Sequence, residues 1–354
     1  MSGSGRRSAR DGIACRDYNA RVPTVESPIV LPDTADESSL EAGSFWNSRA
    51  FGTVCCLFSA VGYSAANVGL RAVAHCDPVW VSAVKAVPTV VLVAPWLVVR
   101  ARRGLPVWPS WRMVVALAVA GLIGQIGGNV FFQWSLGIVG IALAVPLCLG
   151  GQIISSAILG RAVLGEGITW RMAGAIVVLM LSVFVLSAGA GEAQRSVATA
   201  TAQNDWRLLV AGVATVCASG VAYSVLGVVI RRGVQRDVSQ SSILFIVCLV
   251  GLVALGALSF ARIDAQEMLA TSSFDLSMML LAGVCNAVAF LSLTKALQLT
   301  SLVYVNALGA TQATMAALAG VLFFGEARST ALLAGVTLTI VGLLLMSHSK
   351  PHRS

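Results

Sequence analysis

Charged residues are scarce in this chain. Asp, Glu, Lys and Arg make up 11% of its 354 residues, whereas roughly a quarter of the residues in ordinary soluble domains are charged. Hydrophobic residues reach 57%, and the mean hydropathy is +0.83. This composition excludes a soluble cytosolic enzyme, a disordered protein and a disulfide-stabilised secreted module. It predicts an all-α membrane protein.

Metal-ligating side chains are equally scarce inside the apolar runs of the sequence. The three histidines, His75, His348 and His352, lie at the ends of such runs. No CxxC motif occurs, and six of the eight cysteines lie within apolar runs, where thiols behave as small hydrophobic groups. We therefore expect no metal, no cofactor and no catalytic residue, and we do not expect an enzyme.

Ten apolar runs are long enough to cross a bilayer, because about 20 residues span its roughly 30 Å hydrocarbon core. The eight Trp residues lie at or just outside the ends of these runs, which is typical of the aromatic belts at membrane interfaces. The runs are 51–72, 79–99, 112–135, 139–161, 170–189, 208–230, 241–261, 277–298, 302–324 and 329–347.

Residues 1–50 differ from the rest of the chain. They carry six Arg and seven acidic residues and lack the apolar core of a signal peptide, so we expect a disordered cytoplasmic tail. If the tail lies in the cytoplasm and the ten runs cross in turn, twelve basic residues near run ends face the cytoplasm and five face the opposite side of the membrane. This bias predicts that both termini are cytoplasmic, in the plasma (inner) membrane. The sequence has no basic patch with interleaved aromatic residues, so we do not expect nucleic-acid binding. The expected surroundings are lipid, and the sequence leaves the oligomeric state open.

The sequence repeats itself at an offset of 160 residues. Each half then holds five runs, an odd number, so the two copies must cross the membrane in opposite orientations, as in many secondary transporters. We expect a first five-helix repeat over 51–190 and a second over 206–348. The matching pairs are Tyr63-Ser64 with Tyr223-Ser224, Arg71 with Arg231, Gln152 with Gln312, Gly160 with Gly320, and Gly165-Glu166 with Gly325-Glu326.

Two segments carry a resemblance to a known family. The first is FQWSLGIVGIALAVPLCLGGQIISSAILGRAVLGE from Phe132, followed by Gly174. The second is KALQLTSLVYVNALGATQATMAALAGVLFFGE from Lys295, followed by Gly335 and Gly342. Together they resemble the EamA repeat of the drug/metabolite transporter superfamily. This resemblance implies ten helices, cytoplasmic termini, and transport of a small metabolite, amino-acid-like or drug-like. The two inverted halves indicate that transport occurs by alternating access, and export is the expected direction.

Polar side chains recur at helical spacing inside several runs. Such groups are costly in lipid unless they face a cavity or a partner helix. Each could simply form a hydrogen bond that holds two helices together. The presence of such residues on six runs instead favours a cavity that binds a transported solute near the membrane midplane. The candidate residues are Tyr63, Asn67, Gln125, Asn129, Gln152, Tyr223, Asn286 and Gln312. Gln133, Cys148, Ser156, Ser219 and Asn306 lie on the same polar faces.

Lys85 lies about 9 Å into its run, at 1.5 Å per residue. Its stem could snorkel to the interface, which is the favoured interpretation. Alternatively, its ammonium group could anchor an anionic solute, and we keep Lys85 among the cavity candidates. A phosphorylated-sugar or nucleotide-sugar carrier would use Lys85 and Lys295 as phosphate anchors.

No Asp or Glu occurs in the middle of any run. Ion-coupled carriers commonly place a carboxylate there, so we expect uniport, exchange or weak coupling, or proton movement at the Gly-Glu pairs. Gly165, Glu166, Gly325 and Glu326 are interpreted as structural turns that cap helix ends.

The chain shows no charged ring or filter motif of a channel. A non-transporting membrane sensor is the remaining alternative.

Overall fold

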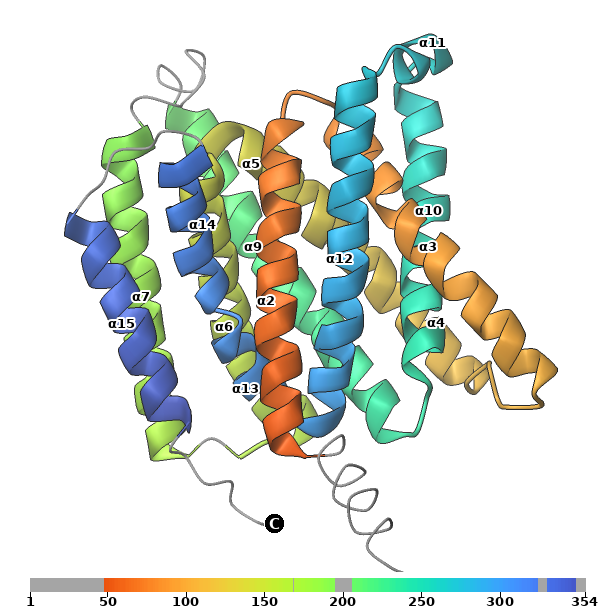
Figure 1. Cartoon of the computed structure of the whole chain (residues 1–354), viewed down its shortest axis with the longest axis horizontal. Coiled ribbons are helices and arrows are strands. Elements are labelled where there is room, and N and C mark those ends of the chain that lie inside the picture. Colours follow the sequence, from red (N-terminus) through yellow and green to blue (C-terminus); the bar gives the residue numbers. More distant parts are fainter. Residues whose placement is uncertain (1–47, 168, 195–205, 324–329, 348–354) are drawn as a thin grey trace, which may run out of the picture. The chain divides into compact units, whose positions relative to one another are not determined.

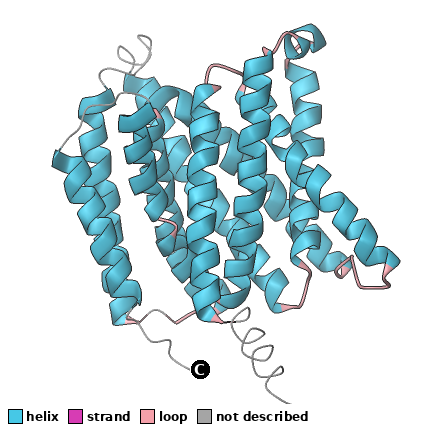
Figure 2. Cartoon of the chain, viewed as in Figure 1, coloured by secondary structure: helices cyan, strands magenta, loops and turns pink. Residues whose placement is uncertain are grey.

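The structure, a computed structural model, describes residues 48–167, 169–194, 206–323 and 330–347, and all their regular elements are helices (Figure 2). These residues belong to one compact unit that spans Ser44–Ser354. The expected tail lies outside the described residues, except for its last three positions. Figure 1 shows the helices α2 Arg49–Ala72, α3 Pro78–Arg102, α4 Trp111–Ile123, η1 Gly124–Val130, α5 Phe131–Val139, α6 Ile141–Leu164, α7 Trp170–Gln194, α9 Trp206–Gln235, α10 Gln240–Arg262, α11 Ala265–Leu269, α12 Ser273–Leu299, α13 Leu302–Leu308, α14 Thr311–Phe323 and α15 Thr330–Ser347.

Each of the ten apolar runs coincides with a helix or with a broken pair of helices. Seven helices in the described part of the chain are long and apolar enough to cross a membrane. Two further apolar stretches, Ala173–Val185 and Leu333–Gly342, are shorter. The chain is therefore an all-helical, multi-pass membrane protein, while the count of ten spans stays a prediction.

Two runs that the sequence predicts as regular α-helices differ in detail: the third is one continuous helix, Trp111–Val139, that changes type along its length, and the ninth is divided. The third run contains η1, a π-helical stretch of seven residues between α4 and α5. The ninth run is divided at Gly309-Ala310 into α13 and α14. Apolar periodicity gives no warning of either feature, because it is continuous through both. The π-helical stretch packs closely against α9, at three positions that lack a side chain: Gly124, Gly127 and Gly128.

Helix starts follow the local sequence. Ser48, Ser239, Ser272 and Ser301 each accept a backbone N–H of the first turn with the side-chain hydroxyl, as N-cap residues do. Asp77 caps α3 in the same way, with Pro78 at the first helical position.

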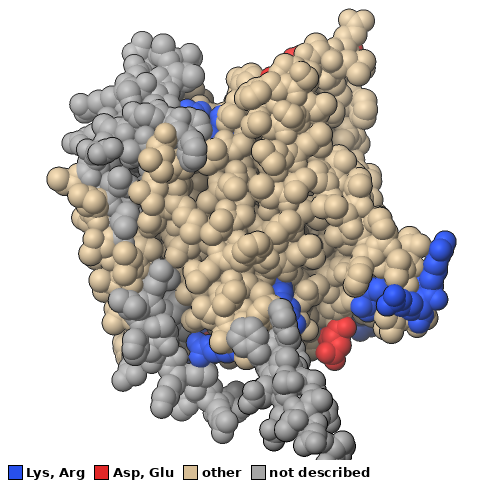
Figure 3. Space-filling model, in the orientation of Figure 1, with Lys and Arg blue, Asp and Glu red and all other residues tan. Residues whose placement is uncertain are grey.

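The surface of the helices is apolar. Phe58, Phe184 and Trp170 are 58%, 70% and 94% exposed. On the face drawn in Figure 3, the described charged side chains lie toward the two ends of the helices, with a broad uncharged band between them. An exposed apolar surface of this extent suits lipid rather than water.

Helices pair across the two halves of the sequence. α2 packs against α12, α7 against α15, and α3 against α10 (Figure 1). At the 160-residue offset, α9 corresponds to α2, and the α4–η1–α5 segment corresponds to α12. α9 packs against that segment. The pairing of α2 with α12 is therefore repeated by the corresponding helices, α9 and α4–η1–α5.

The crossing of α6 and α9 depends on two glycines. A Cβ atom on Gly151 would lie 2.8 Å from the carbonyl oxygen of Cys217. A Cβ atom on Gly220 would overlap the carbonyl oxygen of Cys148 and lie 2.7 Å from the Gln152 nitrogen. Backbone atoms cannot swing away as side chains can, so this close approach requires glycine at Gly220.

Candidate functional site

A cavity of about 150 Å³ lies between the helices. This volume is far above the roughly 10–15 Å³ that one water molecule requires. Residues of α2, α3, η1, α5, α6, α9, α10, α12, α13 and α14 line it. All nine residues that the sequence analysis selects are among them: Tyr63, Asn67, Lys85, Gln125, Asn129, Gln152, Tyr223, Asn286 and Gln312.

Four of these side chains form one hydrogen-bonded chain. The Oδ1 atom of Asn129 accepts from Lys85 Nζ at 2.7 Å and from the Tyr223 hydroxyl at 2.8 Å. Asn129 Nδ2 in turn donates to Gln125 Oε1 at 2.6 Å. The network joins α3, η1 and α9, and it fixes the position of the lysine ammonium group.

Lys85 does not snorkel. It is the eighth residue of α3, it is 6% exposed, and its ammonium group faces the cavity rather than the interface. The snorkelling interpretation is therefore wrong: Asn129, from a distant part of the sequence, supplies an acceptor inside the protein. Among the described residues that line the cavity, Lys85 alone carries a formal charge.

A second polar pair stands on the cavity wall. Gln152 Nε2 donates to Asn306 Oδ1 at 3.0 Å, which links α6 to α13. Asn306 is 6% exposed, and its Nδ2 atom is buried with no hydrogen-bond partner. An unsatisfied buried donor costs about 1–3 kcal/mol, so this amide is suited to an acceptor group on a bound solute.

Other polar residues of the same runs serve packing instead. Gln133 is 2% exposed and donates to the Leu70 carbonyl, which ties α5 to α2. The Ser156 hydroxyl donates to its own helix, and the Ser219 hydroxyl donates to Val216 and to Cys148 Sγ. Cys148 and Asn306 line the cavity as their helical faces suggest, together with Ser59.

The lining becomes aliphatic toward the C-terminal ends of α9 and α12. Ile230, Leu297 and Leu302 line the cavity there, and each is 1% exposed. Sequence reasoning missed this part of the wall, because aliphatic residues that face a cavity cannot be told by type from those that face lipid.

Glu166 joins three elements outside the cavity. Gly165 has a positive φ of 67° and ends α6, and the Glu166 carboxylate then accepts the N–H groups of Leu302 and Val303 at 3.0 and 3.3 Å. Arg231 Nε lies 3.6 Å from Glu166 Oε1. The carboxylate thus caps the start of α13. Gly325 and Glu326, the matching pair, lie outside the described residues.

We expect Glu166→Ala to lower the stability of the protein by about 0.5–2 kcal/mol, the range found when a side chain that accepts N–H groups at a helix start is lost. Glu166→Gln, which keeps one acceptor oxygen, should cost less. Thermal unfolding in detergent measures both. An unchanged midpoint for Glu166→Ala would show that the cap contributes nothing.

The arginines that match in the two halves hold equivalent helix ends. Arg71 Nη1 donates to the Leu136 carbonyl near the end of α5, at 3.3 Å. Arg231 Nη1 donates to the carbonyls of Leu297 and Gln298 near the end of α12. Basic side chains at helix C-termini satisfy carbonyls that have no intrahelical partner.

The described part of the chain combines several helices that are long and apolar enough to span a membrane with a buried polar cavity, which defines the class of multi-pass membrane proteins. Residues 210–348 match the EamA-like transporter family. This part of the chain is therefore an EamA domain of the drug/metabolite transporter superfamily, and the family predicted from the sequence is confirmed there.

The fold occurs among solved structures. One crystal structure superposes with a TM-score of 0.66 and 16% sequence identity, and the alignment covers 84% of this chain and 96% of the other. At this identity the likeness concerns the fold alone. No curated protein matches the chain by sequence.

Proposed function

We propose that the protein transports a small metabolite, amino-acid-like or drug-like, across the membrane by alternating access, in the export direction. The observation that carries the proposal is the buried cavity, which offers amide and hydroxyl groups together with a single ammonium group. Solute sites commonly combine apolar walls with a few convergent polar groups. A carboxylate on the solute suits Lys85, since this ammonium group has no carboxylate partner among the described ion pairs.

The proposed mechanism uses two inverted five-helix repeats, ten helices in all, with both termini in the cytoplasm of a plasma (inner) membrane. The paired packing of α2 with α12 and of α9 with α4–η1–α5 supports this arrangement. The equivalent hydrogen bonds of Arg71 and Arg231 at matching helix ends support it as well. Two such halves can rock about a central site so that it faces either side in turn.

The cavity favours a carboxylate over a phosphate ester. A phosphorylated-sugar or nucleotide-sugar carrier would need further cationic anchors, and Lys295 is absent from the cavity lining. Lys295 Nζ instead donates to the Gln298 side chain near the end of α12. The single ammonium group of Lys85 can balance the single negative charge of a carboxylate but not the two charges of a phosphate ester.

A thermal-shift screen on purified protein tests the proposal. Amino acids should stabilise the protein more than their carboxamides or decarboxylated amines, and a solute at 100 times its Kd adds about 2.7 kcal/mol. Counterflow in liposomes then tests transport of the best solute. Stabilisation without counterflow would favour a non-transporting sensor, and preference for a sugar phosphate would favour the phosphate carrier.

A further inference from the structure

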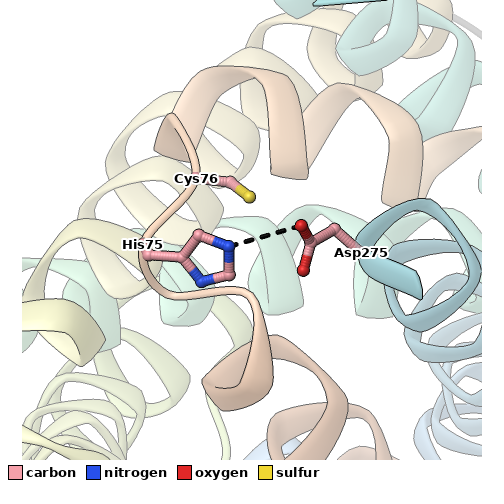
Figure 4. Close-up of side chains that lie close together, drawn as sticks. All are labelled: His75, Cys76 and Asp275. Atoms are coloured by element: carbon pink, nitrogen blue, oxygen red, sulfur yellow. Dashed lines mark hydrogen bonds and ion pairs between the residues drawn. The ribbon is translucent and has the colours of Figure 1, made fainter. Parts of the chain in front are cut away.

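Three metal-ligating side chains meet at one end of the helices, outside the cavity. His75 and Cys76 come from the turn between α2 and α3, and Asp275 comes from the first turn of α12 (Figure 4). The imidazole nitrogen, the thiol sulfur and a carboxylate oxygen all lie within 4.8 Å of one another. The sequence gives no motif for such a site, because Asp275 lies 200 positions from His75.

Two of these groups already interact directly, by a long hydrogen bond (Figure 4). His75 Nε2 and Asp275 Oδ2 are 3.4 Å apart, beyond the usual 2.7–3.2 Å of an N–H···O bond. Two ligands bound to tetrahedral Zn²⁺ at about 2.0–2.1 Å are separated by about 3.4 Å. The separation of the pair is therefore compatible with a shared zinc ion that replaces the hydrogen bond.

The donor set and its surroundings also suit such an ion. Imidazole, thiolate and carboxylate are all common zinc ligands, and thiolate disfavours Mg²⁺ and Ca²⁺. Ser272 Oγ donates to Asp275 Oδ2 at 2.7 Å, which orients the carboxylate. The His75 side chain is 64% exposed, so the ring can turn and an ion can enter from water.

The Cys76 thiol supplies the third ligand after losing its proton. Burial, and then the nearby Asp275 carboxylate, raise the pKa of this thiol. When an ion binds, the sulfur–hydrogen bond breaks, the proton passes to water, and the sulfur lone pair forms the bond to the metal.

We propose that His75, Cys76 and Asp275 form a binding site for Zn²⁺ or a similar divalent transition-metal ion, with water in the fourth position. Such an ion ties the α2–α3 turn to the start of α12. Because α2 and α12 pack along their length and belong to opposite halves of the sequence, the ion fixes the two halves to one another at this end.

Cobalt(II) titration of the purified protein in detergent tests the proposal. Bound Co²⁺ should produce a thiolate-to-metal absorption band with a stoichiometry of one, and Zn²⁺ should abolish the band by competition. Cys76→Ser should eliminate the band. His75→Ala and Asp275→Asn should each weaken Co²⁺ affinity at least tenfold. Cys285→Ser, which removes a partly buried thiol elsewhere on α12, is the matched control and should leave the titration unchanged.

Other outcomes would overturn the site. A band that survives Cys76→Ser, or one that disappears in Cys285→Ser, would place the metal elsewhere. The absence of any band in folded protein would also contradict the proposal. The measurement requires no transport, so its result is independent of the proposed function.

Discussion

Lys85→Met is expected to reduce binding of a carboxylate-bearing solute by about 10²-fold, because a charge-assisted hydrogen bond in a buried site contributes about 1.5–3 kcal/mol. Methionine matches the apolar stem of lysine and lacks only the ammonium group, so most of the cavity wall at this position is kept. The same variant should bind the corresponding carboxamide nearly as well as the unmodified protein does. Thermal shift and counterflow, each with the acid and its amide, measure the difference.

Lys295→Met is the matched control for this prediction. Lys295 lies near the end of α12, bonds to Gln298, and is outside the cavity lining. Its replacement should leave the affinity for the acid within about twofold, as surface charges contribute little. Equal losses in both variants, or no loss in Lys85→Met, would contradict an anchoring role for Lys85.

Gly220→Ala is expected to prevent stable folding of most of the protein. The added methyl group would collide with backbone atoms of α6 at Cys148 and Gln152. Forcing extra atoms into a packed interface typically costs about 1–3 kcal/mol and sometimes more, and here no flexible side chain can yield. Yield of monodisperse protein and the midpoint of thermal unfolding measure the effect.

Gly256→Ala provides the comparison. Gly256 lies in α10, and a Cβ atom there would meet nothing within 4 Å. Since alanine favours a helix interior over glycine by about 0.5–1 kcal/mol, this variant should be as stable as the original or slightly more so. If Gly220→Ala behaved in the same way, the close approach of α6 and α9 would be disproved.

Much of the fold could be predicted from the sequence, because lipid demands continuous apolar runs that satisfy their own backbone hydrogen bonds. The ten runs therefore coincide with helices. The π-helical stretch at Gly124–Val130 and the break at Gly309 escaped prediction, because the apolar pattern of the sequence continues through both. α11 has only five residues, so it carries no apolar run to reveal it.

The candidate site was predictable to a similar degree. Polar residues that recur at helical spacing in a membrane-spanning helix must face either a partner helix or a cavity. The selected residues do line one cavity. What could not be predicted is which polar groups satisfy one another. Gln133 bonds to a backbone carbonyl of α2, whereas Lys85 finds Asn129 on a different helix, and only the packing of helices distinguishes the two cases.

The aliphatic end of the cavity has a consequence for leakage. Ile230, Leu297 and Leu302 offer no group that could replace the hydration shell of an ion, so an ion gains nothing by entering this part of the cavity. The nearest charged groups at this end, Glu166 and Arg231, hold the backbone of Leu302 and Leu297 rather than face the cavity, so an ion would find no charged partner in the described lining there.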